Sequence, residues 1–334
     1  MGYLRLALAV WVMFFHFGVP PGLRVPPGLV AVRCFFVLSG YVIALVLEKR
    51  YAGRLKDYLL LRWLRIYPTY LAAALLSLAA WSLVYLHWGL DRGPVAEWAV
   101  RPLPAAGKLV LVLQQLVLLG QEWGERLSFN GLGLRNYLLV QPAWTLGVEL
   151  CFYLSAPWLL RLKDRWLWAC VAWTLAYVWL DPQPPLPPWP ATYPLEIGFF
   201  CLGALAWRNR RHWDQARLGL LAPLLLALAA TPYLPLDPAA PLALALAPLL
   251  VAAMVPLLHR AGAAWRGDRP AGEISYALYL IHPLAGMALA MHLHGVGPWP
   301  RALILLAGTL ALATVFWMIV EHPVERLRRR LSRD

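Results

Sequence analysis

Apolar segments long enough to cross the hydrocarbon core of a bilayer follow one another along almost the whole chain. In hydrocarbon, the backbone groups of such a segment must bond to each other, and an α-helix satisfies them within the segment. With 61% hydrophobic and only 14% charged residues, the composition excludes an ordinary water-soluble domain. We therefore predict an all-α fold, a polytopic membrane helical bundle of about ten transmembrane helices. The predicted spans lie near residues 3–19, 28–47, 67–87, 142–160, 166–180, 191–207, 217–233, 241–258, 273–294 and 300–321.

A shorter apolar stretch, from Lys108 to Gly120, lies inside a long loop of about residues 88–141. The stretch is short for a span, and the segment before it is polar. We expect an interfacial or re-entrant helix within an extracytoplasmic loop. If the stretch spans the membrane instead, the topology after it inverts.

The basic residues orient the predicted bundle. With the N-terminus in the cytoplasm, 22 of the 30 Lys and Arg residues fall on the cytoplasmic side. The positive-inside rule therefore favours ten spans with both termini cytoplasmic. We expect a multi-pass protein of the cytoplasmic (inner) membrane, with membrane lipids as its surroundings. The net charge of +13 follows from this topology and requires no nucleic acid as a partner.

The rest of the composition indicates a single membrane domain over residues 1–334, with a basic cytoplasmic tail at 322–334. Connections such as DPQPPLPPWP (181–190) are short and proline-rich, so they are rigid and leave no flexible linker. All four cysteines fall in predicted spans, with neither a CxxC pair nor a metal-ligand spacing. We predict no disulfide and no metal.

Arg5 and His16 lie on the first predicted span, separated by ten residues in RLALAVWVMFFH. On a helix they share a face and lie roughly 16 Å apart along the axis, with Arg5 at the mouth and His16 deep in the span, beyond the midplane. An ionisable residue inside a membrane span indicates a functional site, and histidine takes up a proton readily near neutral pH. The alternative is a histidine that hydrogen-bonds between helices for packing alone.

Arg62 and Arg65 are three residues apart in the first cytoplasmic connection and so are neighbours on a helix. Two guanidinium groups on one face suit bidentate phosphate binding. The alternative is that they only set the topology, because basic residues cluster at the cytoplasmic ends of helices.

Glu149 falls inside the fourth predicted span, close to its outer end, in the segment PAWTLGVELCFYL. A carboxylate there should face the protein interior, near a basic group or a polar substrate, and Tyr153 follows one turn later. Trp144 is either an interface anchor or a platform for a sugar ring.

Near the end of the chain, Ser275, Tyr279 and His282 are spaced to share one helix face. We expect them to form a polar stripe turned into the bundle, with Tyr279 and His282 as candidate substrate contacts. Glu321 closes the last span at the cytoplasmic side. We favour a structural role for it, neutralising the arginines that follow.

Six segments together resemble the acyltransferase 3 family of multi-span membrane acyltransferases. They are the R-x10-H of Arg5 and His16, FFVLSG (35–40), RWLRIYP (62–68), WTLGVE (144–149), SYALYLIHP (275–283) and VEHPVERL (320–327). Each motif is short, but the six occur in the right order over nearly the whole chain.

The resemblance implies a ten-helix bundle that takes an acyl group, usually acetyl, from cytoplasmic acyl-coenzyme A and delivers it to a carbohydrate hydroxyl. It further implies that His16 is catalytic, that Arg5 supports it or the donor, and that Arg62 and Arg65 contact coenzyme A phosphates. Arg33 stands where the family often has an aspartate, so no acidic role carries over there. WTLGVELCFYL also retains only the first of two acids in the family pattern.

These inferences predict an O-acetyltransferase with acetyl-CoA or another acyl-CoA as donor, and a carbohydrate or glycolipid acceptor. His16 acts as general base on the acceptor hydroxyl or forms a covalent acyl-histidine, and Glu149 orients the acceptor or the imidazole. The alternative function is export of a polysaccharide or lipid-linked sugar, since polar residues in a bundle also suit a transport path. Against export, the predicted spans show no evident inverted repeat.

Overall fold

The computed structural model describes residues 1–51, 53–88, 94–100, 104–124, 128–129, 132–180, 192–214, 218–238, 240–262 and 264–331. In these parts the regular structure is helical apart from one two-residue pairing, in which β1 (Ser128–Phe129) runs antiparallel to β2 (Leu132–Gly133). The predicted all-α class is confirmed. The proline-rich connection 181–190 and the last three residues of the predicted tail lie outside the described residues.

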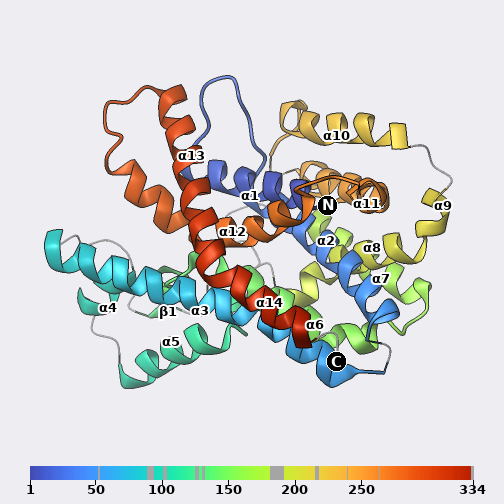
Figure 1. Ribbon diagram of the computed structural model, residues 1–334, viewed down its shortest axis with the longest axis horizontal. Coiled ribbons are helices and arrows are strands. Elements are labelled where there is room, and N and C mark those ends of the chain that lie inside the picture. Colours follow the sequence, from blue (N-terminus) through green and yellow to red (C-terminus); the bar gives the residue numbers. More distant parts are fainter. Residues whose placement is uncertain are drawn as a thin grey trace.

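Every apolar segment predicted from the sequence coincides with helix (Figure 1). The helices that cover these segments are α1 (Gly2–Phe17), α2 (Gly28–Lys49), α3 (Leu55–Trp88), α6 (Trp144–Leu159), α7 (Asp164–Leu180), α8 (Tyr193–Arg208), α10 (Leu221–Ala230), α11 (Pro241–Gly262), α12 (Asp268–Ala290) and α13 (Pro298–Phe316). The shorter helices are α4 (Pro94–Val100), α5 (Ala105–Val117), α9 (Arg210–Asp214) and α14 (His322–Leu331). Single turns complete the chain: η1 (Gln121–Trp123), η2 (Leu134–Tyr137), η3 (Gln141–Ala143), η4 (Leu218–Leu220), η5 (Thr231–Tyr233) and the π-helical η6 (Trp317–Glu321).

Four helices are long and apolar enough to cross a membrane by length and composition: Gly28–Lys49, Leu55–His87, Pro241–Gly262 and Pro298–Leu331. The prediction of about ten transmembrane helices is therefore not confirmed. α6 and α8 have 16 residues each, below the roughly 20 that a typical span requires. α5 has 13 residues, which fits the short helix predicted for that stretch.

The centre of the bundle is the close packing of α2 against α8. A Cβ at Gly40 would lie 1.9 Å from the carbonyl oxygen of Phe200, and one at Gly203 would lie 1.9 Å from that of Val37. Glycine at both positions is what allows the two backbones to approach so closely. Gly40 is the last residue of the FFVLSG segment, so this segment has a packing function.

A buried ion pair joins the same two helices. Arg33 of α2 donates from Nη2 to Glu196 Oε1 at 2.9 Å and from Nε to Oε2 at 3.1 Å, and both side chains are almost wholly inaccessible. Two charges in an apolar interior are stable there only because each compensates the other. Arg33 is the residue that departs from the family pattern, and Glu196 supplies its counter-charge.

α1 and α12 run parallel and in contact, starting from the same end of the molecule (Figure 1). The backbone of Gly2 lies against Gly272, and the backbone N–H of Tyr3 donates to the Asp268 carboxylate at 3.2 Å. Burial raises the pKa of Asp268, but hydrogen bonds from Gly2, the N-terminal amine and Tyr3 outweigh it and lower the pKa below its usual value. This contact sets the register of the two helices, and so determines which residues of α12 lie beside Arg5 and His16.

α14 brings the last described residues to the same end of the bundle. Arg328 donates from Nε to the carbonyl oxygen of Leu61 on α3 at 3.2 Å, and Arg269 at the start of α12 contacts Glu325 at 3.4 Å. Residues 322–331, predicted as a basic tail, therefore form a helix held against α3 and α12. Which side of the membrane this end faces stays a prediction from the basic residues.

The Arg33–Glu196 pair generates a stability prediction. We expect Arg33→Met to lower the free energy of unfolding by about 3–5 kcal/mol, because it leaves the Glu196 carboxylate buried without a counter-charge. Arg33→Met combined with Glu196→Met should recover most of this loss, because no isolated charge remains. The measurement is unfolding of the purified protein in detergent.

The matched control is Arg54→Met, which removes the exposed pair between Arg54 and Asp57. Such surface pairs contribute about 0–1 kcal/mol. Equal effects of Arg33→Met and Arg54→Met would contradict the role assigned to the buried pair.

Candidate functional site

Three cavities follow one another along α3 and α12, and α1 lines the second and the third. The first, the arginine basin, is lined by Arg50, Arg54, Arg62, Arg269, Arg328 and Arg329, together with Val46, Tyr51, Leu61 and Glu325. The second, the inner cavity, is lined by Arg5, Val32, Phe35, Phe36, Arg65, Ile66, Thr145, Leu146, Glu149, Tyr153, Ser275, Tyr276 and Tyr279. The third, the outer cavity, is lined by His16, Phe17, Ala73, Ser77, Trp81, Pro94, Leu138, Leu139, Val140, Gln141, Leu280, Ile281, Pro283, Leu284 and Met287.

The order of the cavities follows from the helical rise of about 1.5 Å per residue. Along α12 the lining residues pass from Arg269 in the basin, through Ser275 to Tyr279, to Leu280 and beyond in the outer cavity. α3 gives the same order, from Leu61 through Arg65 to Ser77. The helices therefore define a path from an arginine-rich end to the histidine on α1.

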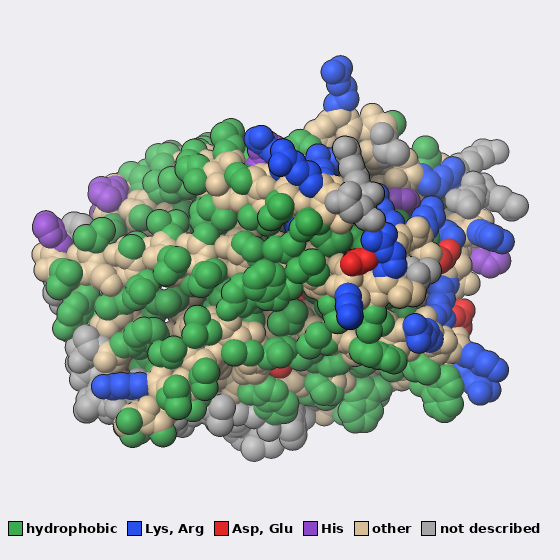
Figure 2. Space-filling model, turned by 60° about the horizontal axis from the view of Figure 1, so that its bottom comes forward, with side chains coloured by type: hydrophobic (Ala, Val, Ile, Leu, Met, Phe, Trp, Pro, Cys, Tyr) green, Lys and Arg blue, Asp and Glu red, His purple; other side chains and the backbone are tan. Residues whose placement is uncertain are grey.

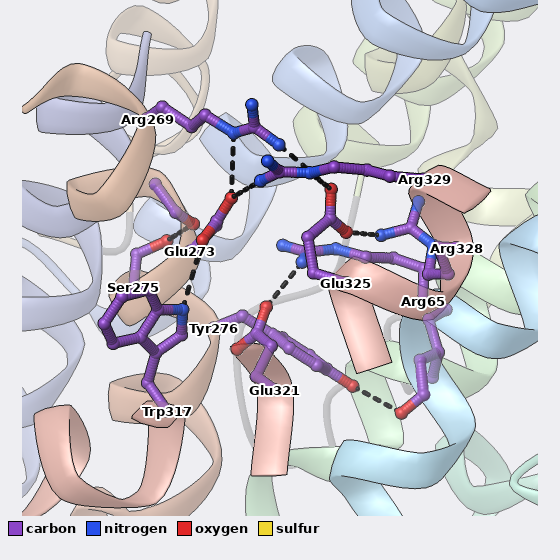
Figure 3. Close-up of polar contacts among 12 residues, drawn as sticks. Arg65, Arg269, Glu273, Ser275, Tyr276, Trp317, Glu321, Glu325, Arg328 and Arg329 are labelled. Carbon is purple, nitrogen blue, oxygen red and sulfur yellow. Dashed lines mark hydrogen bonds and ion pairs between the residues drawn. The ribbon is translucent and has the colours of Figure 1, made fainter. Parts of the chain in front are cut away.

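The arginine basin has a volume of about 460 Å³. Figure 2 shows most Lys and Arg side chains of that face gathered at one end of a hydrophobic surface. In the basin, Glu273 and Glu325 bridge Arg269 and Arg329, and Glu325 also pairs with Arg328 (Figure 3). Arginines therefore outnumber carboxylates around this cavity, which makes it suitable for a polyanion.

The structure separates Arg62 from Arg65, which the sequence paired as one phosphate site. Arg65 lines the inner cavity and forms a 2.5 Å ion pair with the buried Glu321, and its guanidinium lies over the Tyr276 ring. Arg62 lines the basin, its buried Nε has no partner among the described residues, and its guanidinium lies 6.0 Å from the centre of the Tyr153 ring. Arg62 is thus the side chain that connects the two cavities.

Glu321 also differs from expectation in its partner. It was expected to neutralise the arginines that follow it, whereas its ion pair is with Arg65 on α3 (Figure 3). The π-helical turn of η6 ends at Glu321, and the arginines of α14 pair instead with Glu273 and Glu325. The bond from Arg65 therefore fixes the end of α13 against α3.

Glu149 lies at the inner cavity with Arg5, and its predicted place near the outer end of a span is wrong. Thr145, one turn earlier on α6, bonds to the hydroxyl of Tyr279 at 2.9 Å, and Tyr279 lies in the middle of α12. α6 begins at this depth because the preceding turn, η3, is itself buried in the protein. The Arg5 guanidinium and the Glu149 carboxylate line the same small cavity of about 80 Å³. Arg5 makes no ion pair within the described ranges.

Hydroxyl groups hold the Glu149 carboxylate in place. Oε1 accepts hydrogen bonds from Ser39 and from the Tyr153 hydroxyl, the latter at 2.5 Å. Tyr58 in turn donates to the backbone carbonyl of Tyr153 at 3.1 Å. These hydrogen bonds fix the orientation of the carboxylate at the inner cavity, which Arg5 also lines.

His16 is exposed, so the expectation of a buried histidine is wrong. α1 ends at Phe17, because Gly18 adopts a φ of 83° and Pro20 follows, so His16 is the next-to-last residue of its helix. Its side chain lines the outer cavity, which has a volume of about 330 Å³. This position gives His16 access to a substrate that a fully buried residue would not have.

His282 stacks beside His16, with ring centres 5.3 Å apart. His282 is fully buried, its Nδ1 lies 2.8 Å from the carbonyl oxygen of Tyr279, and its Nε2 has no partner among the described residues. A carbonyl oxygen only accepts, so Nδ1 carries the proton and Nε2 is the free base. The polar stripe of Ser275, Tyr279 and His282 is buried as predicted: Ser275 and Tyr279 line the inner cavity, while His282 lines none of the three cavities and lies beside His16.

Trp144, like His282, is a candidate residue that lines none of the three cavities. It is partly buried at the start of α6. Trp81 of α3 occupies the outer cavity instead, with Ser77 and Gln141. Trp81, Ser39 and Tyr276 are not among the site residues predicted from the sequence. The only sequence signal for Ser39 is that it is a polar residue within FFVLSG.

Comparison with known proteins identifies the family. Residues 1–318 match the acyltransferase 3 family, described as an acyltransferase domain. The chain belongs to this family.

One relative of this acyltransferase 3 protein is "Nodulation protein 10" of Rhizobium leguminosarum bv. viciae, which is 30% identical over 218 residues. The match covers 57% of this chain and 57% of the relative, so it spans little more than half of that protein. No solved structure matches the chain. The family supports a membrane acyltransferase.

The separation of Arg62 from Arg65 predicts different costs for removing each in this acyltransferase. Arg65→Ala should lower the free energy of unfolding by about 3–5 kcal/mol, because it leaves Glu321 buried and unpaired. Arg62→Ala should lower it by less than about 1 kcal/mol, since no ion pair is lost. Thermal unfolding in detergent measures both, and equal losses would contradict the separate roles.

Proposed function

We propose that the protein transfers an acyl group, acetyl, from acyl-coenzyme A in the arginine basin to a carbohydrate hydroxyl in the outer cavity. The observation that carries the proposal is the order of the three cavities along α3 and α12, from many arginines to one accessible histidine on α1. A polyanionic donor belongs at the first end, and the reacting hydroxyl at the second. The family membership supports the reaction class.

The donor's length suits the path. The phosphates of coenzyme A bind among the basin arginines, with Arg62 at the inner edge, and the thin pantetheine arm extends through the inner cavity past Arg5 and Arg65. The inner cavity, at about 80 Å³, is too small for the nucleotide. The thioester then lies toward His16.

The chemistry assigned to His16 is general base catalysis. The imidazole takes the proton of the acceptor hydroxyl as its oxygen attacks the thioester carbonyl, and the thiolate of coenzyme A leaves and is protonated. In the alternative route, the imidazole nitrogen itself attacks and forms an acyl-histidine, which the acceptor then cleaves. Glu149 and Arg5 hold the donor arm in the inner cavity in either route.

The lining of the outer cavity supports a carbohydrate acceptor. Trp81 offers an aromatic surface, while Ser77, Gln141 and His16 offer polar groups. Sugars present both an apolar ring face and hydroxyl groups, so this mixture suits them. In this proposal Trp81 takes the platform role first considered for Trp144.

The proposal predicts the effect of removing the imidazole. His16→Ala should reduce acyl transfer by about 10²- to 10⁴-fold while the protein still folds, since that is the usual contribution of a general base. The control is His292→Ala, which removes an exposed histidine that lines none of the three cavities. Transfer by folded His16→Ala protein at the rate of the control would end the catalytic assignment.

Sidedness gives a second test. In oriented proteoliposomes, acyl-coenzyme A supplied only at the arginine-rich side should acylate a carbohydrate acceptor confined to the opposite side, because the two cavities lie at opposite ends of the path. The measurement is mass spectrometry of the acceptor. Product formed only when both substrates are on the arginine-rich side would contradict transfer across the membrane.

A further inference from the structure

A fourth cavity, the aromatic cavity, lies at the arginine-rich end and has no part in the path described above. It has a volume of about 550 Å³. Its lining residues are Ala44, Leu47, Glu48, Tyr51, Gly53, Leu55, Pro157, Trp158, Leu160, Arg161, Trp207 and Arg208. The walls are therefore mostly apolar and aromatic, with a few charged groups, which is typical of a small-molecule site.

The aromatic cavity adjoins the arginine basin. Tyr51 lines both cavities, and it follows Arg50, which lines the basin. The Tyr51 side chain is buried and its ring lies 6.3 Å from that of Tyr58. A ligand with one anionic part and one flat apolar part therefore has a matching cavity on each side of a fixed tyrosine.

The two tryptophans of this cavity differ in availability. Trp207 is almost wholly buried, donates from Nε1 to Glu48 at 2.6 Å, and carries the Arg210 guanidinium 3.7 Å from its ring centre. Trp158 is 58% exposed, so its indole is accessible for stacking. Aromatic side chains stack readily on nucleic-acid bases.

Arg208, at the end of α8, lines this cavity but is already occupied. It donates to the carbonyl oxygens of Leu160 and Leu162, in the turn that follows α6.

The arginines around the two cavities differ in whether they are already paired. Arg208 is bound to Asp164, and Arg54 to Asp57. Arg161 in the aromatic cavity, and Arg50 and Arg62 in the basin, make no ion pair within the described part of the chain. Three guanidinium groups are thus available for phosphate, one of them beside Trp158.

We propose that the aromatic cavity binds the adenine base of the coenzyme A donor, stacked on Trp158. Arg161 binds the 3′-phosphate that adjoins the base, and Arg50 and Arg62 bind the pyrophosphate. This inference rests on the proposed acyl-coenzyme A donor and adds the part of the protein that recognises its nucleotide. It assigns donor selectivity to the ends of α2, α6 and α8, away from the reacting histidine.

The test compares three ligands that contain successively less of the nucleotide end: coenzyme A, its 3′-dephospho form, and pantetheine. Calorimetry on the purified full chain in detergent measures their binding. Trp158→Ala should weaken binding of both nucleotides about tenfold and leave pantetheine unchanged, because only the base stacks on the indole. Trp158→Phe keeps an aromatic ring and should retain most of the affinity.

Arg161→Gln should weaken coenzyme A about tenfold and leave the 3′-dephospho form unchanged, since only the former carries the phosphate. The controls are Trp168→Ala and Arg165→Gln, which remove exposed residues of α7 that line none of the four cavities. If the wild-type protein binds coenzyme A and Trp158→Ala binds it equally well, the base site is wrong while the donor assignment stands. If the wild-type protein binds none of the three ligands, the donor assignment fails and the base site with it.

Discussion

A charge inside an apolar helical bundle must meet an opposite charge or a polar cavity, and this requirement arranges the protein. Arg33 with Glu196 joins α2 to α8, and Arg65 with Glu321 joins α3 to the end of α13. These two pairs connect helices far apart in the sequence. Arg5 and Arg62 face cavities without such a pair, so the charges that the fold leaves uncompensated mark the candidate donor path.

The parallel contact of α1 with α12 determines where the chemistry can occur. Because Gly2 at the start of α1 lies against Gly272, in the second turn of α12, Arg5 reaches the level of Tyr276 and Tyr279 at the inner cavity, and His16 reaches His282. The R-x10-H spacing of Arg5 and His16 therefore matches the separation of the inner cavity from the outer cavity. In the proposed function, a linear acyl-coenzyme A donor extends over that distance.

Arg33 shows how the family pattern can change while the fold is kept. Where related sequences often have an aspartate, this chain has an arginine, and Glu196 on the facing helix supplies the negative charge. Gly40 and Gly203 keep the two backbones in contact around that pair. The charge at this position therefore serves the packing of α2 on α8, and the candidate site lies elsewhere, at Glu149 and the arginines.

Hydropathy alone located the helices, because a long apolar segment has few other ways to satisfy its backbone. Spacing alone also predicted the buried stripe on α12 and an arginine-rich end. The sequence could not determine how deep each of these side chains lies in the bundle. Glu149 lies in mid-bundle because η3 is buried beneath it, and His16 is exposed because Gly18 ends its helix there. The sequence also could not predict which residues form ion pairs, such as Glu196 with Arg33 and Glu321 with Arg65. Such contacts exist only once distant helices pack together.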